Sequence, residues 1–247
     1  MSLRRAFDIL VSAVCLCLSL PVILVALIGV WLQDRRNPIY ASWRMGQHEK
    51  PFRFYKIRTM VVDASKAGRH TTSSDDPNVT ALGRFLRRFK VDELLQFWTI
   101  IQGHMSLAGP RPNTPQVTQV YTAEERGVFK VKPGLTDFSS IVFSDLDALM
   151  AGAADVNTAY DQTIRPWKSR LGLVYVANAS LWLDIQLLAL TALNFVNRPA
   201  ALNGVVSILT RLNASAELVE VAARREPPKP CPPPGAHSAN LSQMAQH

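Results

Sequence analysis

The sequence has little cysteine and no ligand spacing typical of a protein metal cluster. Cys15 and Cys17 lie inside an apolar run and Cys231 lies in a proline-rich segment, so no disulfide framework is predicted. The five histidines are scattered, and none has zinc-ligand spacing to a cysteine. A reducing compartment that faces the cytoplasm fits this composition best.

Glycine-rich phosphate loops are also absent. Neither GxxxxGK[ST] nor GxGxxG occurs in the 247 residues, so the usual nucleotide-binding signatures are excluded. No internal repeat is visible either. A chain of this length can form one good core, with some sequence left over.

Positive charge, in contrast, is in excess. Lysine and arginine number 27 against 19 acidic residues, for a net charge of +8 and a pI of about 9.7. This balance favours an anionic partner, which is nucleic acid, a phospholipid surface or a phosphorylated substrate.

Charge is missing altogether between Ile9 and Leu32. A helix over this run would be about 36 Å long, enough to cross a hydrocarbon core of about 30 Å. The simplest interpretations are a transmembrane anchor or a signal peptide that begins at Arg4 and Arg5. A signal peptide is disfavoured because the run is too long and no small-x-small cleavage site follows it before Arg35.

Two features of this run disagree with a straight span. Pro21 lies in its middle, where it removes a backbone donor, and the Ser19 hydroxyl can satisfy a freed carbonyl. Both flanks are basic, which by the positive-inside rule places both ends in the cytoplasm. A helix-break-helix hairpin that enters and leaves by one leaflet accounts for both features. These observations alone support the re-entrant hairpin and the straight span about equally.

The rest of the chain predicts a mainly α fold with a small β-hairpin element. Alternating aromatic residues in 37–62 predict short strands with a turn near 45–47, 63–80 is a polar loop, and 80–102 is predicted to be helical. The apolar stretch 171–196 contains Asp184, so it is predicted to form a buried or interface-lying helix pair rather than a lipid-exposed span. The predicted organisation is a membrane anchor over 1–36, a catalytic domain over 37–200 and an extension over 201–247. Its proline-rich part beyond Glu226 is expected to be extended and outside the fold.

Asp92 and Glu93 are the most informative acidic pair. They precede an apolar helical segment and follow a basic cluster made of Arg84, Arg87, Arg88 and Lys90. Adjacent helical carboxylates point about 100° apart, so one can bind a metal while the other attacks a substrate. Taken alone, the pair is much better explained by the ordinary preference for acidic residues in a first helical turn.

Arg111 lies between Pro110 and Pro112. The prolines fix the local backbone, so the guanidinium loses little entropy when it binds a phosphate or a planar base. A rigid turn with a solvated arginine explains the pattern equally well. The basic residues around Lys56 and Arg58 suit either phosphates or anionic lipid head groups.

These segments, in this order, resemble the bacterial sugar transferase family, the monotopic polyprenol-phosphate phosphoglycosyl transferases that begin glycan assembly. The segments are the apolar run with its central proline, YKIRTM at 55–60, LGRFLRRFKVDELLQFW at 82–98, GHMSLAGPRP at 103–112 and KPGLTD at 132–137. The resemblance covers about residues 4–193 and is to the compact form, which lacks additional amino-terminal membrane helices.

The resemblance implies a two-step reaction. Asp92 would attack the β-phosphate of a UDP-sugar and release UMP, and polyprenol (undecaprenyl) phosphate would then take the sugar phosphate from the enzyme. Glu93 would hold Mg²⁺. Arg111 with Pro110 and Pro112 would contact the nucleotide or its phosphate, and the further basic residues expected at the phosphate site are Lys56, Arg58 and Arg87. Ser19 and Pro21 match the helix break of a re-entrant element, which favours the hairpin.

The resemblance also implies the setting of the reaction. The chain would act at the cytoplasmic face of the bacterial cytoplasmic membrane, in the first membrane step of exopolysaccharide, O-antigen or glycoprotein glycan assembly. Its partners would be membrane lipid and downstream glycosyltransferases, with no nucleic acid. The sugar is not identified by the motifs, and 63–80 and 138–166 are the expected determinants.

The chain departs from the family pattern at four positions. Leu20 stands directly before the membrane proline, Leu95 follows Asp-Glu-Leu, and His104 and Asp137 replace a common acidic residue and a usual glycine. The rival interpretation is a basic, membrane-anchored protein that binds anionic lipid or nucleic acid. It leaves the Asp-Glu and Pro-Arg-Pro motifs unexplained, and the basic stretches lack interleaved aromatic residues on which bases could stack.

Overall fold

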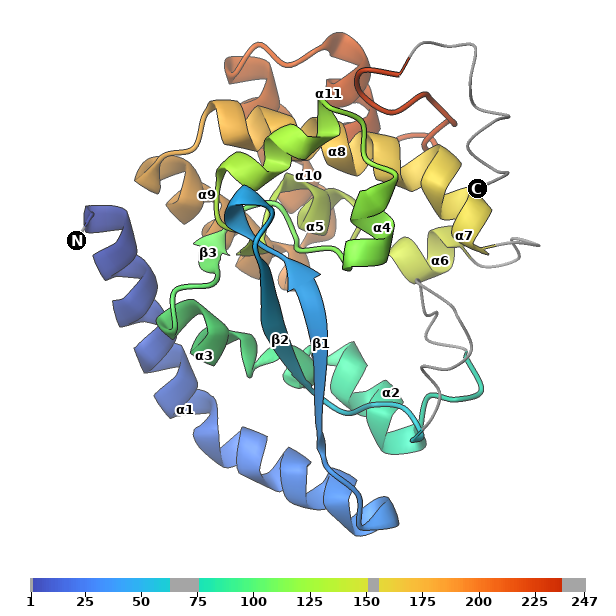
Figure 1. Cartoon of the computed structure of the whole chain (residues 1–247). Coiled ribbons are helices and arrows are strands. Elements are labelled where there is room, and N and C mark those ends of the chain that lie inside the picture. Colours follow the sequence, from blue (N-terminus) through green and yellow to red (C-terminus); the bar gives the residue numbers. More distant parts are fainter. Residues whose placement is uncertain (1, 63–75, 151–155, 237–247) are drawn as a thin grey trace.

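The computed structural model describes residues 2–62, 76–150 and 156–236 (Figure 1). The described chain is mainly helical with one small hairpin, as predicted. The hairpin, β1 (Ile39–Met45) and β2 (Pro51–Ile57), pairs antiparallel with Met45 opposite Pro51, and η1 (Gln47–Glu49) joins its strands. This confirms the strands and the turn expected in 37–62.

The apolar run forms a single helix, α1 (Leu3–Asp34). The Ser2 side chain accepts a hydrogen bond from the Arg5 N–H at its start, and Arg35 ends it in the left-handed conformation. By length and composition it is the one described helix that could cross a membrane. Most of its length is not covered by protein, and its buried residues are Asp8, Ser12, Ile23, Ala26 and Val30.

The helix-break-helix expected at Ser19 and Pro21 is not seen as an interruption, because α1 continues through Pro21. Ser19 Oγ donates to the Leu16 carbonyl at 3.2 Å. The carbonyl that loses its donor to Pro21 is that of Cys17, four residues earlier, so this bond is not the one expected. Figure 1 shows that the axis of α1 changes direction along its length. A bend at an interior proline is the usual consequence of the lost backbone donor.

The first turns of α1 are bonded to the globular body. Arg5 donates to the Ile100 and Ile101 carbonyls at 2.7 and 2.8 Å, at the end of α3 (Gln96–Ile101). Asp8, buried, accepts from Ser106 Oγ at 2.8 Å at the start of β3 (Ser106–Ala108). With the bonds from Leu107 N–H to Asp8 at 3.1 Å and from Arg4 to Asp184 at 3.0 Å, these contacts fix the amino-terminal end of α1.

The last turns of α1 are bonded to the same body. Asp34 accepts two hydrogen bonds from Arg58, at 2.6 and 2.7 Å, directly after β2. Val30 is buried and clusters with Ile57 and Leu86. Both ends of α1 therefore contact one globular unit.

The helix predicted over 80–102 is divided into three pieces. α2 (Ala81–Arg88) begins at Thr80, whose side chain accepts from the Gly83 N–H, and it ends before Lys90, which has a φ of 55°. A short turn, η3 (Val91–Glu93), then leads to α3. The prediction of one continuous helix is wrong here, because a left-handed residue stops a helix.

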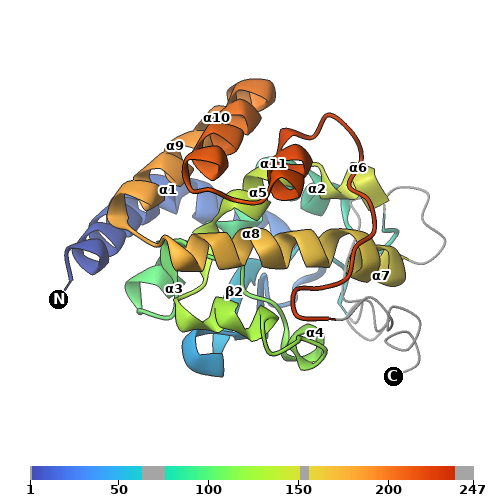
Figure 2. The same cartoon turned by 90° about the horizontal axis from the view of Figure 1, so that it is seen from above.

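The main hydrophobic core is formed mostly by residues 138–222, in the second half of the chain. Its remaining elements are α4 (Pro115–Gln119), η4 (Glu125–Lys130), β4 (Gly134–Thr136), α5 (Phe138–Val142), α6 (Leu146–Met150), α7 (Val156–Ala159), η5 (Tyr160–Ile164), α8 (Arg165–Ala177), α9 (Leu181–Val196), α10 (Arg198–Arg211) and α11 (Ala216–Ala223). Fully buried Leu171, Tyr175 and Leu187 from α8 and α9 lie in this core. The helix pair expected in 171–196 is confirmed, and Figure 2 shows α9 and α10 running beside each other.

The carboxyl-terminal extension differs from the expectation. α10 and α11 contribute Val205, Leu209 and Ala222 to the main core. The proline-rich segment that follows crosses α8, where Trp167 Nε1 donates to the Lys229 carbonyl at 2.9 Å. The extension up to residue 236 is thus part of the fold, because it covers apolar surface of α8. Residues 237–247 lie outside the described part of the chain.

Candidate active site

Asp92 and Glu93 lie in η3, at the point where the left-handed Lys90 turns the chain from α2 into α3. Glu93 Oε1 accepts from Lys56 Nζ of β2 at 3.1 Å and from the Arg111 guanidinium. Asp92 is buried, with 5% of its surface exposed. Residues from η3, β2 and the loop after β3 thus meet at one carboxylate. Their expected roles in binding substrate and metal stay predictions.

The two adjacent carboxyl groups have opposite electrostatic surroundings. Burial alone would raise the pKa of Glu93, but the charges of Arg111 and Lys56 outweigh it and hold that pKa well below its usual value. Burial raises the pKa of Asp92, with Lys56 opposing the rise and ionised Glu93 adding to it. Opposite shifts in a neighbouring pair are typical of groups with different chemical roles.

The two basic partners of Glu93 are perturbed as well. The carboxylate of Glu93 raises the pKa of Arg111, while burial lowers the pKa of Lys56 against the attraction of Glu93. Both side chains are partly withdrawn from water, and a nearby carboxylate compensates the hydration that they lose. Glu93 therefore serves as the counter-ion that keeps both cations in place.

The Pro110–Pro112 turn that carries Arg111 is held by a parallel strand pair, β3 with β4. The Gly109 N–H donates to the Thr136 carbonyl at 2.9 Å, and the Gly134 N–H donates to the Pro110 carbonyl at 3.1 Å. A Cβ on Gly134 would lie 2.1 Å from the Gly109 nitrogen, so only glycine fits. Prolines on both sides of Arg111 and this strand pair together make the turn rigid.

Arg87, predicted at the phosphate site, lies on the last turn of α2. Its Nε donates to Thr59 Oγ1 at 2.9 Å. Its charge, with that of Lys90, also opposes the raised pKa of Asp92. The structure therefore brings Arg87 and Lys90 within electrostatic range of the acidic pair.

Arg58 lies elsewhere. Its guanidinium is bonded to Asp34 and to the Asn37 carbonyl at 2.8 Å, at the end of α1. No bond joins it to Asp92 or Glu93 among the described residues. Its contact with a substrate phosphate stays a prediction, and the structure gives it a role in fixing α1.

The carboxyl groups present could share a divalent cation with a substrate. No group of three or more metal-ligating side chains occurs in the described parts of the chain. Mg²⁺ in phosphate chemistry is commonly bound by one or two protein carboxylates together with waters and substrate phosphates. Asp92 and Glu93 are a donor set of that size and type.

Arg44 of β1 was not singled out from the sequence. Its Nη1 lies 3.5 Å from the Pro112 carbonyl, and its guanidinium stacks 5.4 Å from the Phe54 ring centre. In the hairpin Arg44 lies opposite Phe52, on the same strand face as Phe54 and Lys56. Alternate residues of a strand lie on the same face, so the register of the hairpin is enough to place Arg44 beside Phe54 and Lys56.

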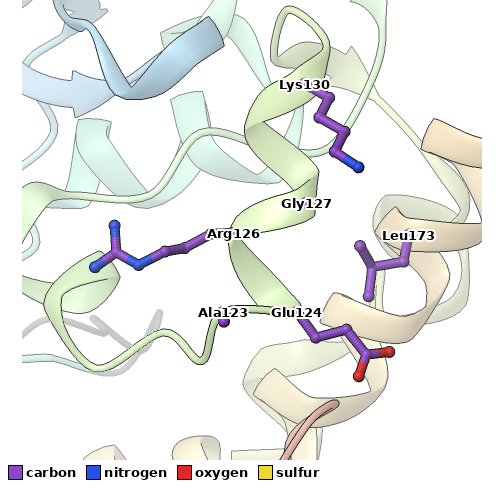
Figure 3. Close-up of a pocket in the computed structure, with 6 residues that line it drawn as sticks. All are labelled: Ala123, Glu124, Arg126, Gly127, Lys130 and Leu173. Atoms are coloured by element: carbon purple, nitrogen blue, oxygen red, sulfur yellow. The ribbon is translucent and has the colours of Figure 1, made fainter.

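A separate hollow of about 470 Å³ lies between η4 and α8 (Figure 3). Its lining residues are Ala123, Glu124, Arg126, Gly127, Lys130 and Leu173. Arg126 extends from η4 on the side away from Leu173 and pairs with Glu49 at 2.5 Å. This hollow contains neither acidic residue of η3 and has no comparable convergence of buried charges.

Comparison with known proteins identifies the family to which the chain is similar. A model of the family described as bacterial sugar transferase matches residues 1–198. An undecaprenyl-phosphate glucose phosphotransferase of Komagataeibacter xylinus is 32% identical over 195 residues, 76% of this chain and 35% of that protein. An undecaprenyl-phosphate galactose phosphotransferase of Salmonella typhimurium is 31% identical over 219 residues, 81% of this chain and 41% of that protein.

A shorter relative is covered almost completely. The uncharacterized sugar transferase EpsL of Bacillus subtilis is 31% identical over 193 residues, 77% of this chain and 86% of that protein. The chain spans less than half of the two longer relatives. The family match over residues 1–198 includes α1, η3 and the Pro110–Pro112 turn. On the match to its first 198 residues, the chain belongs to the bacterial sugar transferase family.

Proposed function

We propose that the chain transfers a sugar 1-phosphate from a UDP-sugar to polyprenol phosphate, with undecaprenyl phosphate as the lipid. The observation that carries the proposal is the buried Asp92 beside an ionised Glu93, surrounded by Lys56 and Arg111. Such a site suits an anionic diphosphate and a carboxylate nucleophile. The names of the two longer relatives, which describe phosphotransferases that act on undecaprenyl phosphate, support the same chemistry.

In the first proposed step, a carboxylate oxygen of Asp92 attacks the β-phosphorus of the UDP-sugar. The bond from this phosphorus to the bridging oxygen breaks, UMP leaves with the electron pair, and an aspartyl phosphosugar is formed. In the second step a phosphate oxygen of the lipid attacks the same phosphorus. The bond to Asp92 breaks, which restores the carboxylate and yields polyprenyl diphosphosugar.

The raised pKa of Asp92 and the lowered pKa of Glu93 support this division of roles. Asp92 is the more basic and the less stabilised carboxylate, as a nucleophile should be. Glu93 keeps its charge and holds Arg111 and Lys56 toward the phosphates. When bound by Glu93, Mg²⁺ would offset the charge of the diphosphate.

The basic residues have separate proposed tasks. Arg111, held by Pro110 and Pro112, binds the nucleotide phosphate through its planar fork, which matches two oxygens at once. Lys56 and Arg87 add positive charge on two other sides of Asp92. Together they lower the energy of the charge that develops on the phosphate oxygens during transfer.

We also propose that α1 enters and leaves the membrane by one leaflet, with the body on the cytoplasmic face. Arg5 near the start of α1 and Asp34 at its end are both bonded to the same body. A straight span would place about 30 Å of hydrocarbon between these ends. Exposed apolar residues of α9, with Trp182 65% and Val196 87% exposed, supply a second surface suited to the membrane interface.

A screen of UDP-sugars tests the proposal. The purified chain in detergent or nanodiscs is incubated with Mg²⁺, short-chain polyprenol phosphate and each UDP-sugar, and UMP is measured. Release of UMP that requires the lipid for sustained turnover is expected with at least one sugar. Lipid or nucleic-acid binding without UMP release from any sugar would favour the rival binding protein.

A further inference from the structure

Arg44 is a further cation within electrostatic range of Glu93. It lies on the inner face of the hairpin, and Phe54 lies between it and Lys56. The Arg44 guanidinium is 5.4 Å and the Lys56 ammonium 5.6 Å from the centre of the Phe54 ring. The same aromatic ring thus positions one cation from β1 and one from β2 toward the Pro110–Pro112 turn.

The contacts of Arg44 leave its charge without a partner. Its one described hydrogen bond is the long 3.5 Å contact to the Pro112 carbonyl, and its Nε is buried with no hydrogen-bond partner. No carboxylate forms an ion pair with it in the parts of the chain that the structure describes. Burial and the neighbouring charge of Arg111 both lower the pKa of Arg44, and Glu93 only partly opposes them.

A cation in this position is unfavourable in the free protein. Withdrawing a charge from water is unfavourable unless an opposite charge or full hydrogen bonding compensates the lost hydration. Glu93 is already shared by Lys56 and Arg111. The cations around the acidic pair outnumber the carboxylates that act on them: the cations are Arg44, Lys56, Arg87, Lys90 and Arg111, and the carboxylates are Asp92, Glu93 and Asp137. An entering anion would offset this excess of positive charge.

We propose that Arg44 is a substrate-binding residue that contacts the diphosphate of the sugar nucleotide beside Arg111. The inference rests on the proposed transferase function and adds a residue to its binding site. The contact with Pro112 ties Arg44 to the turn that presents Arg111, so two planar guanidinium groups serve one diphosphate. Guanidinium groups suit this role because each can donate two parallel hydrogen bonds to phosphate oxygens.

The test compares Arg44→Ala and Arg44→Lys with Arg53→Ala. Arg53 is a matched control, since it lies on the opposite face of the same hairpin and stacks on Trp43 at 4.3 Å. Affinity for UDP is measured by titration calorimetry, and KM is measured separately for the UDP-sugar and for polyprenol phosphate. Thermal unfolding shows that each variant is folded.

For Arg44→Ala we expect UDP affinity to fall about 10- to 100-fold, the loss typical of a charged hydrogen bond. The KM for the UDP-sugar should rise in parallel, the KM for polyprenol phosphate should stay within about threefold, and Arg44→Lys should lie between. Arg53→Ala should match the wild type in all three.

Two results would overturn the assignment: unchanged UDP affinity in folded Arg44→Ala and Arg44→Lys, or a rise in the KM for polyprenol phosphate alone. The proposed function fails separately, if the wild type binds UDP through Arg44 but releases UMP from no UDP-sugar.

Discussion

Asp92 and Glu93 are neighbours in the chain, but their surroundings give them different stability. Glu93 is held ionised by Arg111 and Lys56, so its carboxylate contributes to folding at neutral pH. The raised pKa of Asp92 means that its ionised form is less stable in the folded protein than in the unfolded chain. A catalytic carboxylate is often unfavourable for folding in this way.

This contrast predicts opposite effects of two isosteric substitutions at pH 7. Glu93→Gln should lower the free energy of unfolding by about 1–3 kcal/mol, because it removes the counter-ion of two partly buried cations. Asp92→Asn should leave it unchanged or raise it, because it removes a destabilised charge. Thermal or chemical unfolding of the two variants checks this, and equal destabilisation by both would contradict it.

The pH dependence of the Glu93 contribution follows from the direction of its shift. A carboxyl group whose pKa is lowered by folding stabilises the fold above its unfolded pKa, near 4.5, and loses this contribution as the pH falls toward the folded value. The stability difference between wild type and Glu93→Gln should therefore be full at pH 6–7 and shrink below about pH 4.5. A difference that does not change down to pH 3 would exclude the ion pairs as its source.

Glu93 should also set the metal requirement. With Gln in its place, the Mg²⁺ concentration for half-maximal UMP release is expected to rise about 10- to 100-fold, since a carboxylate ligand is lost. Glu49→Gln is a suitable control, because Glu49 is a surface partner of Arg126 and lies outside the site. A metal titration identical to that of the wild type would remove Glu93 from the list of ligands.

Residues that belong to a distinctive sequence motif could be predicted. Residues whose place in the site depends on how the two strands of the hairpin pair could not. Asp92, Glu93, Lys56 and Arg111 were predicted, and the structure brings them together. Arg44 was counted only among basic residues near the anchor, because its position on the inner strand face follows from the pairing with β2. Arg58 was assigned to phosphates from a motif, whereas Asp34, far away in the sequence, accepts its hydrogen bonds.

At the scale of the elements, α1 is the described helix that is long and apolar enough to enter a membrane. The length of α1 and its lack of charge could be predicted from the sequence. Its contacts could not, because Asp8 and Arg5 bond to residues about a hundred positions away. The left-handed backbone at Lys90 could not be predicted either, since no sequence pattern identifies a non-glycine residue with positive φ reliably. That turn places Asp92 beside β2 instead of on the outside of a longer helix.

The two ends of α1 should be accessible from the same side of the membrane. Single cysteines at Ser2 and at Arg36, introduced into a chain without Cys15, Cys17 and Cys231, would be labelled with a membrane-impermeant maleimide. Both should react in inside-out vesicles and neither in right-side-out vesicles. Labelling of the two positions from opposite sides would establish a straight span.

At the scale of the whole molecule, the carboxyl-terminal extension closes the fold. The composition of the proline-rich segment predicts that it lies outside the fold. This prediction is wrong for residues 227–236, because prolines can pack against apolar side chains and their carbonyls can accept hydrogen bonds. Pro228 and Pro233 are buried, and Arg170 Nη2 donates to the Pro232 carbonyl at 2.9 Å. The segment covers α8 without contributing to the acidic site.

Removal of this segment should therefore lower stability without removing the chemistry. A chain that ends at residue 226 loses the hydrogen bonds of Trp167 and Arg170 to it and should unfold with about 2–3 kcal/mol less free energy, at about 1 kcal/mol per bond plus lost burial. It should still release UMP below its unfolding temperature. A chain that ends at residue 236 is the control, and an equal effect of both truncations would contradict the role given to residues 227–236.

The central claim is that Asp92 carries the sugar phosphate between the two substrates. Intact-protein mass spectrometry after incubation with the preferred UDP-sugar and Mg²⁺, without lipid acceptor, tests it most directly. The account predicts a mass increase of one sugar phosphate that disappears when polyprenol phosphate is added, that maps to the peptide containing Asp92, and that is absent in Asp92→Asn. Lipid-dependent turnover with no such adduct, or an adduct that persists in Asp92→Asn, would contradict it.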